Sequence, residues 1–574
     1  MKLGEILVNK GYITKAQLDQ GLIDSGSTGE ILGKTLMKLG FITEEKLLMA
    51  LSEQLGLVYY PSLKDVVVDA AVIKAVPARF VEHYKFMPLK LKGKTLTIAI
   101  SNPLESWSLE DIRLHLGFDT EKVLASEEEI QVAIRKYYGI GADTVERILE
   151  TGSDKQKPVA GQDVTVVEDI EKSAEDASVI KLVNLILVEA ISSRATDIHI
   201  EPYRDRVRVR QRIDGILYTM KVPEDIKFLH PAIVSRIKIL SHLDVVERRI
   251  PQDGRARIKL ADSEVDLRIS IIPGFFGENV VIRVLPIKVS FNFDEVGLSD
   301  EERKIVEGLI KRPHGVMFLT GPTGSGKTTT LYSFLAHINS AEVKIITIED
   351  PVEYELEGVT QIQINPKIGF SFASALRSIL RHDPDVMMIG EVRDLETAEL
   401  AIRSALTGHL IFSTLHTNDA PSAATRLVDI GIEPYLLASS VNAFIAQRLV
   451  RQICPNCKEM AKEPLTEIRR IQLGIPSEVL EDRRKAGGKE IMVYRGRGCE
   501  VCRFTGFKGR LAIFEILVIE DSIRELIIKK APASEIKKKA CELGMKTLRQ
   551  QGWQKVVEGL TTPEEVVRVV QLEE

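Results

Sequence analysis

Eight residues in the middle of the chain constrain its fold more than any other feature. Residues 321–328 read Gly-Pro-Thr-Gly-Ser-Gly-Lys-Thr and satisfy the pattern G-x-x-x-x-G-K-[ST]. The apolar run 316–319 precedes them and the helix-forming run 329–335 follows. A strand, a glycine-rich turn and a helix in this order form a P-loop, in which backbone N–H groups and the helix N-terminus bind phosphate. We therefore expect an α/β domain that binds and hydrolyses ATP.

The positions of this loop predict how the nucleotide is held. The glycines let the backbone approach the phosphates, Lys327 reaches the β- and γ-phosphates, and Thr328 ligates Mg²⁺. The predicted nucleotide-binding residues are Gly321, Pro322, Thr323, Gly324, Ser325, Gly326, Lys327, Thr328 and Thr329. ATP and Mg²⁺ are the corresponding cofactors.

Three further apolar runs, residues 345–348, 386–389 and 410–412, have the length of buried strands. Because they alternate with helical patterns, they predict a parallel sheet. The run 386–389 ends in Gly390-Glu391. Ligands bind at the carboxyl ends of parallel strands, so we expect Glu391 to lie beside the P-loop strand, to orient the attacking water and to contribute to the Mg²⁺ site. A solvated loop acid is the alternative.

Length and composition limit the remaining possibilities. A chain of 574 residues is too long for a single core, so three or four domains are expected. With 44% hydrophobic and 28% charged residues it has an ordinary soluble composition, and its formal net charge of -5 disfavours bulk nucleic-acid binding. No apolar run reaches the ~18 residues that span a bilayer, and the charged N-terminus does not resemble a signal peptide. We expect a cytoplasmic, multidomain protein.

The first 56 residues contain an internal repeat with a spacing of 29 residues. The matching positions are Leu3-Gly4 with Leu32-Gly33, Gly11 with Gly40, Ile13-Thr14 with Ile42-Thr43, and Leu18 with Leu47. Each copy predicts a short helix that ends at its glycine and a second helix capped by its threonine, with Thr14 and Gln17 as a capping box. The repeat indicates paired short helices.

Changes in pattern divide the chain into five parts. They are a helical repeat module (1–56), a small α/β domain (57–138), a polar linker (139–177), an α+β domain (178–290) and the P-loop domain with a helical C-terminal tail (291–574). In the α+β domain a hairpin turns at Asp214-Gly215. In a second hairpin the period of two buries Leu267 and turns Arg268 to the other face.

Four of the five cysteines form two Cys-x-x-Cys pairs, which suits metal binding in a reducing compartment. Cys454, Cys457, Cys499 and Cys502 are predicted to hold a structural Zn²⁺ within the segment 452–512, with residues 458–498 as an excursion that returns. Four ordinary reduced thiols are the alternative. The separate Cys541 is expected to be buried. Farther on, Thr562, Pro563 and Glu565 predict the start of the last helix by a cap, an N1 proline and a capping box.

Five segments resemble motifs of the secretion ATPases that drive bacterial type II secretion and type IV pilus assembly. Ile348-Glu-Asp-Pro-Val-Glu353 resembles their aspartate box, and Thr407 to Asn418 resembles their histidine box. Arg381 to Asp394 resembles their atypical Walker B motif, in which a glycine (Gly390) replaces the usual aspartate. Ser193 to Pro202 and Arg212 to Gly215 resemble segments of their second N-terminal domain. The resemblance covers about residues 60 to 574. It implies a RecA-like ATPase domain preceded by a PAS-like α+β domain.

The resemblance also implies roles for particular residues. Glu353 and Glu391 correspond to the active-site acids of the family, and His416 to its γ-phosphate-sensing histidine. Arg268 and Arg283 correspond to arginines that reach the nucleotide bound to the neighbouring subunit of a hexameric ring. By position alone, a histidine such as His416 is more often a turn or core residue, and an arginine on a strand surface is usually an ordinary surface residue.

Within the family the chain is most similar to the pilus assembly ATPases. That implies a homo-hexamer, peripheral to the inner membrane, whose partners are an inner-membrane pilus platform protein and a cytoplasmic pilus adaptor protein, with no nucleic acid. A type II secretion motor is the alternative. A nucleic-acid translocase and a nucleotide-gated scaffold that rarely hydrolyses rank lower.

The front module resembles the c-di-GMP-binding N-terminal domain found on some of these ATPases. That motif begins Arg-Leu-Gly and ends in glutamine. Here the first copy has Lys2 and Ser25 at those two places, whereas the second keeps Gln54. Lysine meets phosphate as a point charge and not as a planar fork. Dinucleotide binding and a purely structural helical module are therefore both open.

Overall fold

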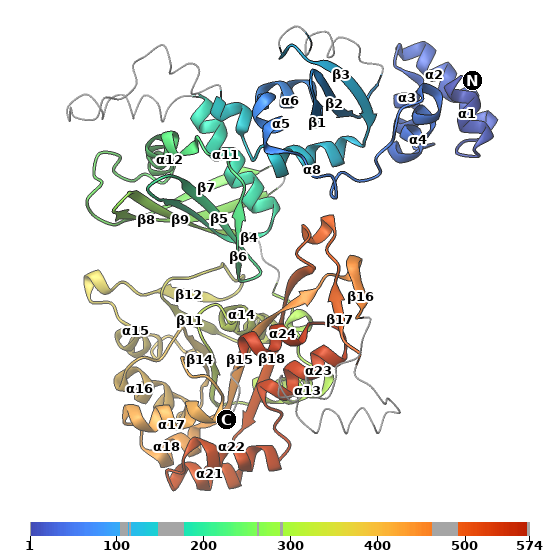
Figure 1. The fold of residues 1–574 in the computed structure, drawn as a ribbon. Helices are drawn as coiled ribbons and strands as arrows, with labels where there is room; N and C mark the ends of the chain where they lie inside the picture. Colours follow the sequence, from blue (N-terminus) through green and yellow to red (C-terminus); the bar gives the residue numbers. More distant parts are fainter. Residues whose placement is uncertain are drawn as a thin grey trace. The chain divides into compact units, whose positions relative to one another are not determined.

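The computed structural model describes residues 2–103, 113, 116–146, 177–260, 263–286, 291–461 and 492–570 (Figure 1). The chain divides into two compact units, residues 1–286 and 287–574. Within the described residues, no helix combines the length and the apolar character needed to cross a membrane.

The repeat is present in the structure as two similar helix pairs. They are α1 (Leu3–Asn9) with α2 (Lys15–Thr28) and α3 (Leu32–Lys38) with α4 (Glu44–Leu55). Gly11 and Gly40 follow the first helix of each pair with φ of 67° and 70°, as predicted. Gln17 and Thr14 form the expected capping box. A Cβ atom on Gly4 would lie 2.8 Å from Leu18, and one on Gly33 3.0 Å from Leu47, so the repeated glycines allow the same close helix packing in both copies.

A small α/β element follows the repeat. Its members are α5 (Ala70–Ala75), α6 (Ala78–Tyr84), β1 (Met87–Lys92), β2 (Thr95–Ile100), β3 (Asp119–Leu124) and α8 (Glu127–Tyr137). The strands form a sheet of order β1-β2-β3, with β1 and β2 antiparallel and β2 and β3 parallel. Buried residues of this element and of the helix pairs form one hydrophobic cluster, which extends from Ile6 to Ile134.

The beginning of the predicted linker has a defined structure. Residues 142–146 are helical, and Val145 is 1% exposed in the core of the following α+β element. Glu146 accepts hydrogen bonds from the backbone N–H groups of Ala78 and Arg79. The assignment of residues 139–146 to a linker is therefore wrong, because sparse apolar residues are enough to anchor a short helix. Residues 147–176 of the predicted linker lie outside the described residues.

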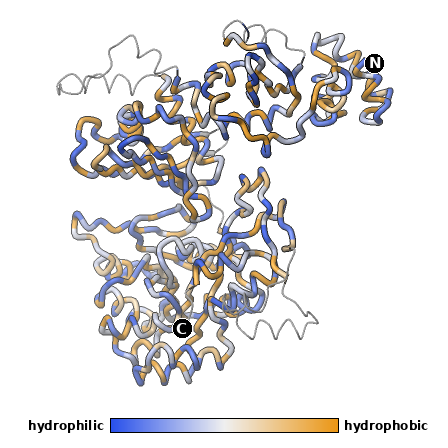
Figure 2. The backbone as a smooth tube through the Cα atoms, viewed as in Figure 1, coloured by the Kyte–Doolittle hydropathy of each residue, from blue (hydrophilic) through white to orange (hydrophobic). Residues whose placement is uncertain are grey.

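The α+β element is a six-stranded sheet of order β6-β5-β4-β9-β8-β7. Its strands are β4 (Ala195–Pro202), β5 (Val207–Ile213), β6 (Ile216–Met220), β7 (Gln252–Leu260), β8 (Ser263–Gly274) and β9 (Gly277–Pro286). All pairs are antiparallel. Helices α11 (Ala177–Ser192) and α12 (Ile226–Leu240) cover one face, and their apolar residues share a core with alternate strand residues. Figure 2 shows hydrophobic and hydrophilic positions interspersed through this part of the chain.

The second unit is built on a seven-stranded sheet of order β12-β11-β13-β14-β10-β15-β18. Its strands are β10 (Gly315–Thr320), β11 (Ile345–Glu349), β12 (Thr360–Gln363), β13 (Val386–Ile389), β14 (Leu410–Leu415), β15 (Val441–Ile453) and β18 (Phe507–Val518). Only the β15–β18 pair of this sheet is antiparallel. The parallel part confirms the RecA-like α/β class that the apolar runs and the family resemblance predicted.

Helices surround this sheet and extend from it as the C-terminal tail. They are α13 (Asp300–Ile310), α14 (Lys327–Ile338), α15 (Phe372–Ile379), α16 (Leu395–Leu406), α17 (Pro421–Ile430), α18 (Pro434–Ser440), α21 (Asp521–Ile528), α22 (Ala533–Glu542), α23 (Leu548–Val557) and α24 (Pro563–Val569). A short ladder of β16 (Lys458–Met460) and β17 (Tyr494–Gly496) closes the predicted excursion after the first cysteine pair. The described part of the chain also contains 3-10 turns at Phe293–Glu295, Pro366–Ile368, Pro455–Cys457 and Glu500–Cys502.

Three local predictions about this unit are wrong. The strand that carries Glu391 is not beside the P-loop strand, because β14 lies between β13 and β10. Cys541 is exposed and not buried. Thr562 does begin the last helix, with Pro563 at N1, but its side chain makes no cap hydrogen bond. The carboxylate of Glu565 binds Arg451 and Arg568 instead.

Candidate functional site

The P-loop lies between β10 and α14, as predicted. Gly321, Gly324 and Gly326 have φ of 146°, 79° and 90°, and Gly326 caps α14 directly before Lys327. A Cβ atom on Gly321 would lie 2.6 Å from the backbone oxygen of Gln447, so only glycine fits at that position. The loop thus combines left-handed backbone, a helix N-terminus and an amine, which is the arrangement that holds a phosphate chain.

Lys327 is 9% exposed and folds back onto its own loop. Its Nζ donates to the backbone oxygens of Gly321 and Pro322 at 2.6 and 3.1 Å. Burial, reinforced by repulsion from Arg448, lowers the pKa of Lys327 to about 8. The amine is therefore desolvated and close to its charge transition, so an anion in the loop would stabilise its charged form.

The structure brings Glu391 and His416 together. His416 Nε2 lies 3.4 Å from Glu391 Oε2, and Arg393 pairs with the other carboxylate oxygen. Glu391 is also close enough to Lys327 to favour the charged form of that amine. The carboxylate, the imidazole and the P-loop amine therefore lie at one end of the parallel sheet. Arg393 was not predicted as a member of this group.

Side-chain hydrogen bonds hold this end of the sheet together. Thr414 Oγ1 donates to the Gly390 backbone oxygen at 2.7 Å, which fixes the segment before Glu391 against β14. Thr320, the last residue of β10, accepts from the Thr417 backbone N–H at 2.9 Å and so fixes the residue after His416 to the P-loop strand. These bonds position Glu391 and His416 relative to the P-loop although their strands are not all adjacent.

Gly390, which stands where the related motif has an aspartate, lies close to the neighbouring strand. A Cβ atom there would lie 3.3 Å from the backbone oxygen of Ile348 on the neighbouring strand. A Cβ atom would therefore be a tight fit here. The following residue, Glu391, supplies the carboxylate at this end of the strand.

Glu353 follows a turn that a buried hydrogen-bond network supports. Glu349, 3% exposed, accepts from Thr347 at 2.6 Å and from Gln361 at 3.2 Å, and it also binds the hydroxyl of Tyr332 on α14. Burial raises the pKa of Glu349. Glu353 itself is half-buried and contributes to that rise by repulsion, so the structure places it near Glu349. The network connects the P-loop helix to the segment that carries Glu353.

Arg448 is a second residue of this region that the sequence did not reveal. It is 8% exposed on β15 and donates to the Asn418 backbone oxygen at 2.7 Å. A Cβ atom on Gly321 would lie 2.9 Å from its Nη1. Arg448 thus contacts the residues behind both the P-loop and the histidine segment. Its position within a long strand that is buried on both faces gave no periodic signal.

Arg268 and Arg283 belong to the first unit, where they lie directly opposite each other on β8 and β9. Both are on the face of the sheet that α11 and α12 leave open, as the predicted alternation requires for Arg268. Arg283 Nε lies 3.4 Å from Asp197 Oδ1. The structure thus places the two predicted arginines side by side on one surface.

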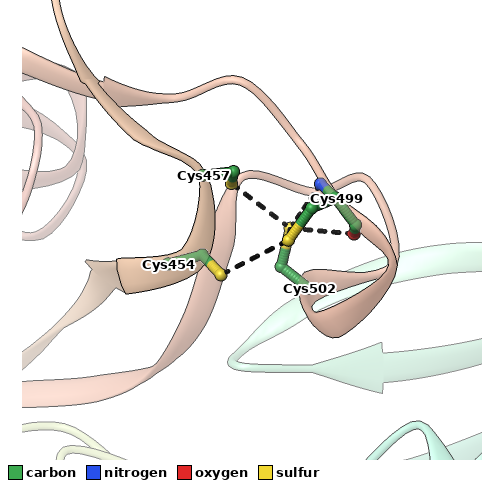
Figure 3. A group of neighbouring side chains, drawn as sticks. All are labelled: Cys454, Cys457, Cys499 and Cys502. Atoms are coloured by element: carbon green, nitrogen blue, oxygen red, sulfur yellow. Dashed lines mark hydrogen bonds between the residues drawn. The ribbon is translucent and has the colours of Figure 1, made fainter. Parts of the chain in front are cut away.

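The four paired cysteines converge as predicted (Figure 3). The Sγ atoms of Cys454 and Cys499 are 3.8 Å apart, as are those of Cys457 and Cys502, and the Cys499–Cys502 distance is 3.7 Å. Sulfur atoms placed tetrahedrally around Zn²⁺ at about 2.3 Å are roughly 3.8 Å apart, so the site has the dimensions that Zn²⁺ requires. Backbone N–H groups of Gly498 and Cys499 donate to two of the sulfurs, as outer contacts of thiolate ligands do.

The donor groups near the P-loop also suit Mg²⁺. Thr328 is exposed in the first turn of α14, and Glu391 supplies a carboxylate at the same end of the sheet. Hydroxyl and carboxylate oxygens are the hard ligands that Mg²⁺ prefers, usually together with water and phosphate oxygens. The residues present therefore fit the predicted metal.

Comparisons with known proteins show the family of most of the chain. The family described as "Type II/IV secretion system protein" matches residues 172–568, and the MshEN domain matches residues 55–144, after the helical repeat. The type IV pilus assembly ATPase PilB of Myxococcus xanthus is 43% identical over 99% of this chain and 98% of its own length. PilB of Acinetobacter baylyi is 35% identical over 98% of this chain and 95% of its own. Type II secretion system protein E of Xanthomonas campestris is 42% identical over 87% of this chain and 85% of its own length.

The match over residues 172–568 includes the P-loop, and together with the ATPase relatives it confirms an ATP hydrolase of the P-loop type. On this evidence the chain belongs to the type II/IV secretion system protein family of ATPases.

Proposed function

We propose that this chain forms a hexameric ATPase motor that powers type IV pilus assembly at the inner membrane. The choice of pilus assembly over type II secretion rests on the share of this chain that each group of relatives matches. The pilus assembly ATPases of Myxococcus xanthus, Acinetobacter baylyi and Thermus thermophilus match 99%, 98% and 94% of this chain. Five type II secretion relatives match 83% to 89% of it. The pilus relatives therefore account for more of the chain.

In the proposed cycle ATP binds to Lys327 and Thr328 of one subunit and contacts Arg268 and Arg283 of its neighbour. Charge-assisted bonds between arginine and phosphate favour a closed arrangement of the two subunits. Glu391 orients the water that attacks the γ-phosphate, and His416, within reach of Glu391, responds to that phosphate. Loss of the γ-phosphate removes those contacts and releases the closed state.

The resulting domain rotation would turn an inner-membrane platform protein, with an adaptor protein on the cytoplasmic side, while the motor remains peripheral to the membrane. Mg²⁺, held by Thr328 and Glu391, would neutralise phosphate charge. Zn²⁺, held by Cys454, Cys457, Cys499 and Cys502, would be structural, because four protein ligands leave no position for a substrate.

Glu391→Gln tests the proposed chemistry. The amide keeps the size of the side chain but cannot act as a base, so we expect turnover to fall by about 10²–10³-fold while ATP is still bound. Lys327→Ala should lose both binding and turnover. Asp385→Asn is the control, because Asp385 lies at the other end of β13 and accepts from the Lys344 backbone N–H at 2.7 Å. Turnover like that of the wild type in Glu391→Gln would refute the role of this acid.

A type II secretion motor is the second candidate, favoured by 42% identity over 87% of the chain. Complementation separates the two. We expect the chain to restore piliation, and not protein secretion, in strains that lack the corresponding ATPase. Restored secretion without pili would reverse the assignment.

We further propose that the helical module 1–56 binds c-di-GMP and regulates the motor. The support is its resemblance to such modules and the closely matching packing of its two copies around Gly4 and Gly33. Calorimetry with c-di-GMP and full-length protein should show binding that Lys2→Arg strengthens, because arginine can hold a phosphate with two hydrogen bonds. If neither the wild type nor Lys2→Arg gave heat at tens of micromolar c-di-GMP, the module would have a purely structural role.

A further inference from the structure

The hydroxyl of Tyr332 joins the P-loop helix to the segment that carries Glu353. Tyr332 is fully buried and lies on α14, five residues after Lys327. Its hydroxyl donates to the carboxylate of Glu349, the last residue of β11. The backbone N–H groups of Glu353 and Tyr354 donate to the same hydroxyl oxygen. One buried oxygen atom thus contacts both the end of a strand and the backbone of a predicted active-site acid.

The neighbours of this hydroxyl fix its orientation. A hydroxyl has one hydrogen to donate, and burial raises the pKa of Tyr332, so that hydrogen is retained. Its acceptor, the carboxylate of Glu349, is held in turn by Thr347 Oγ1 at 2.6 Å and Gln361 Nε2 at 3.2 Å. Because the hydrogen points to Glu349, the oxygen lone pairs remain available to the two backbone N–H groups.

Other contacts hold the residues that follow Glu353. Gln361 Nε2 donates to the Tyr354 backbone oxygen at 2.9 Å. The rings of Tyr332 and Tyr354 both pack against Phe291, with centroids 5.1 and 5.6 Å from its own. These contacts remain when the Tyr332 hydroxyl is removed. Loss of that hydroxyl alone should therefore displace the backbone of Glu353 without unfolding the segment.

We propose that Tyr332 is a positioning residue that holds Glu353, as an active-site acid of ATP hydrolysis, at a fixed distance from the P-loop. This inference rests on the role of Glu353 that the family resemblance implies. Five residues of α-helix span about 7.5 Å, so α14 rigidly connects Lys327 to Tyr332. The helix whose N-terminus meets the phosphates therefore also carries the group that holds the acid. A displaced acid lowers the reaction rate and not the ATP affinity, because the P-loop binds the phosphates.

The test removes only the hydroxyl, in Tyr332→Phe, and uses the full-length protein at concentrations that permit oligomers. We expect kcat for ATP to fall about tenfold, close to the value of one hydrogen bond, while the Kd for a fluorescent ATP analogue stays within about twofold of the wild type. Tyr137→Phe is the matched control. The Tyr137 hydroxyl also bridges backbone groups, since it donates to the Val66 oxygen at 2.7 Å and accepts from the Val68 N–H at 3.3 Å, but it lies in the first unit.

The control should lower Tm to a similar extent and leave kcat unchanged, because its hydroxyl is remote in sequence from the P-loop unit. Equal kcat values for Tyr332→Phe and Tyr137→Phe would overturn the inference. A tenfold weaker Kd in Tyr332→Phe would also overturn it, since the hydroxyl would then support the P-loop and not the acid.

A double-mutant cycle tests whether Tyr332 acts through Glu353. Glu353→Gln removes the acid, so adding Tyr332→Phe to it should lower kcat by less than about twofold more. A further tenfold loss would overturn the inference, because the hydroxyl would then act on another group. Wild-type kcat in Glu353→Gln would overturn the inference together with its premise. Turnover is measured on purified protein, so none of these outcomes depends on whether the motor serves pili.

Glu349→Gln provides a second variant if Tyr332→Phe folds poorly. The neutral amide is a weaker acceptor than a carboxylate for the hydrogen of the Tyr332 hydroxyl, so this change loosens the hydroxyl without removing it. We expect kcat to fall severalfold at an unchanged Kd, and to fall no further in the Glu353→Gln background. Wild-type kcat in a folded Glu349→Gln protein would contradict the proposed chain of contacts.

Discussion

The ammonium group of Lys327 lies against the backbone oxygens of Gly321 and Pro322. The residue as a whole is 9% exposed. Burial, and then repulsion by Arg448, lowers its pKa to about 8. Above pH 8 the neutral amine therefore predominates. Bound phosphate favours the charged amine, so nucleotide binding takes up a proton in this range.

We accordingly predict that the Kd for ATP rises with pH above 8, with a limiting slope of about tenfold per pH unit. Titration with a fluorescent ATP analogue from pH 7 to 9.5 measures it. Lys327→Arg is the control, because arginine stays charged throughout. An equal slope in that variant would place the titrating group elsewhere.

At the scale of elements, Glu565 connects α24 to β15. It accepts from Arg451 Nη2 at 2.7 Å and from Arg568 Nη2 at 2.7 Å, and its side chain is 3% exposed. Burial alone would raise the pKa of Glu565, but the hydrogen bonds from Arg568 and Arg451 outweigh it and lower that pKa to about 2. The carboxylate therefore stabilises the fold above its unfolded pKa of about 4.3, and this contribution is lost as the pH falls toward 2.

Glu565→Gln should destabilise the second unit by about 3–5 kcal/mol at pH 7, because it leaves Arg451 buried without its carboxylate. The wild type should lose that advantage between about pH 4.5 and 2. Thermal unfolding across this pH range measures both effects. Arg568→Ala removes a more exposed partner and should cost less than about 1 kcal/mol. Equal Tm values for the two variants at pH 7 would contradict this account.

The cysteine cluster lies where β15 ends, since Cys454 follows Ile453 directly. We predict about one Zn²⁺ per chain and a lower Tm after chelation, because a closed four-thiolate site contributes folding free energy. Cys499→Ser should lose zinc, whereas Cys541→Ser, which changes an exposed cysteine outside the cluster, should keep it. Metal quantification well below one equivalent per chain in the wild type would reject the site.

Local patterns predicted the elements but not their order. Short windows of sequence show the P-loop glycines and the hairpin at Asp214-Gly215. They also show the apolar runs that form buried strands. An apolar run looks the same whichever strand lies beside it, so nothing in the sequence placed β14 between β13 and β10. Arg448 was missed for a related reason, because its burial depends on Asn418, 30 residues away along the chain.

At the scale of the whole molecule, the two halves of the proposed site belong to different units of the chain. The P-loop, Glu391 and His416 lie in residues 287–574, and Arg268 and Arg283 lie in residues 1–286. If the arginines act on a neighbouring subunit, a single chain can bind ATP but lacks part of what stabilises the transition state. Binding and turnover should then depend differently on assembly.

We therefore predict that turnover per chain rises with chain concentration and reaches a plateau when oligomers are complete, while ATP retention per chain rises much less steeply, because the P-loop alone already holds the nucleotide. Removal of an arginine that acts in trans typically costs about 10³–10⁵-fold in turnover, so the isolated chain should be nearly inactive. Steady-state phosphate release combined with sedimentation at each concentration measures the relation. Arg268→Gln should assemble at the same concentrations but remain at the low rate. Turnover that is independent of concentration, in samples shown to be monomeric, would mean that one chain contains the complete site.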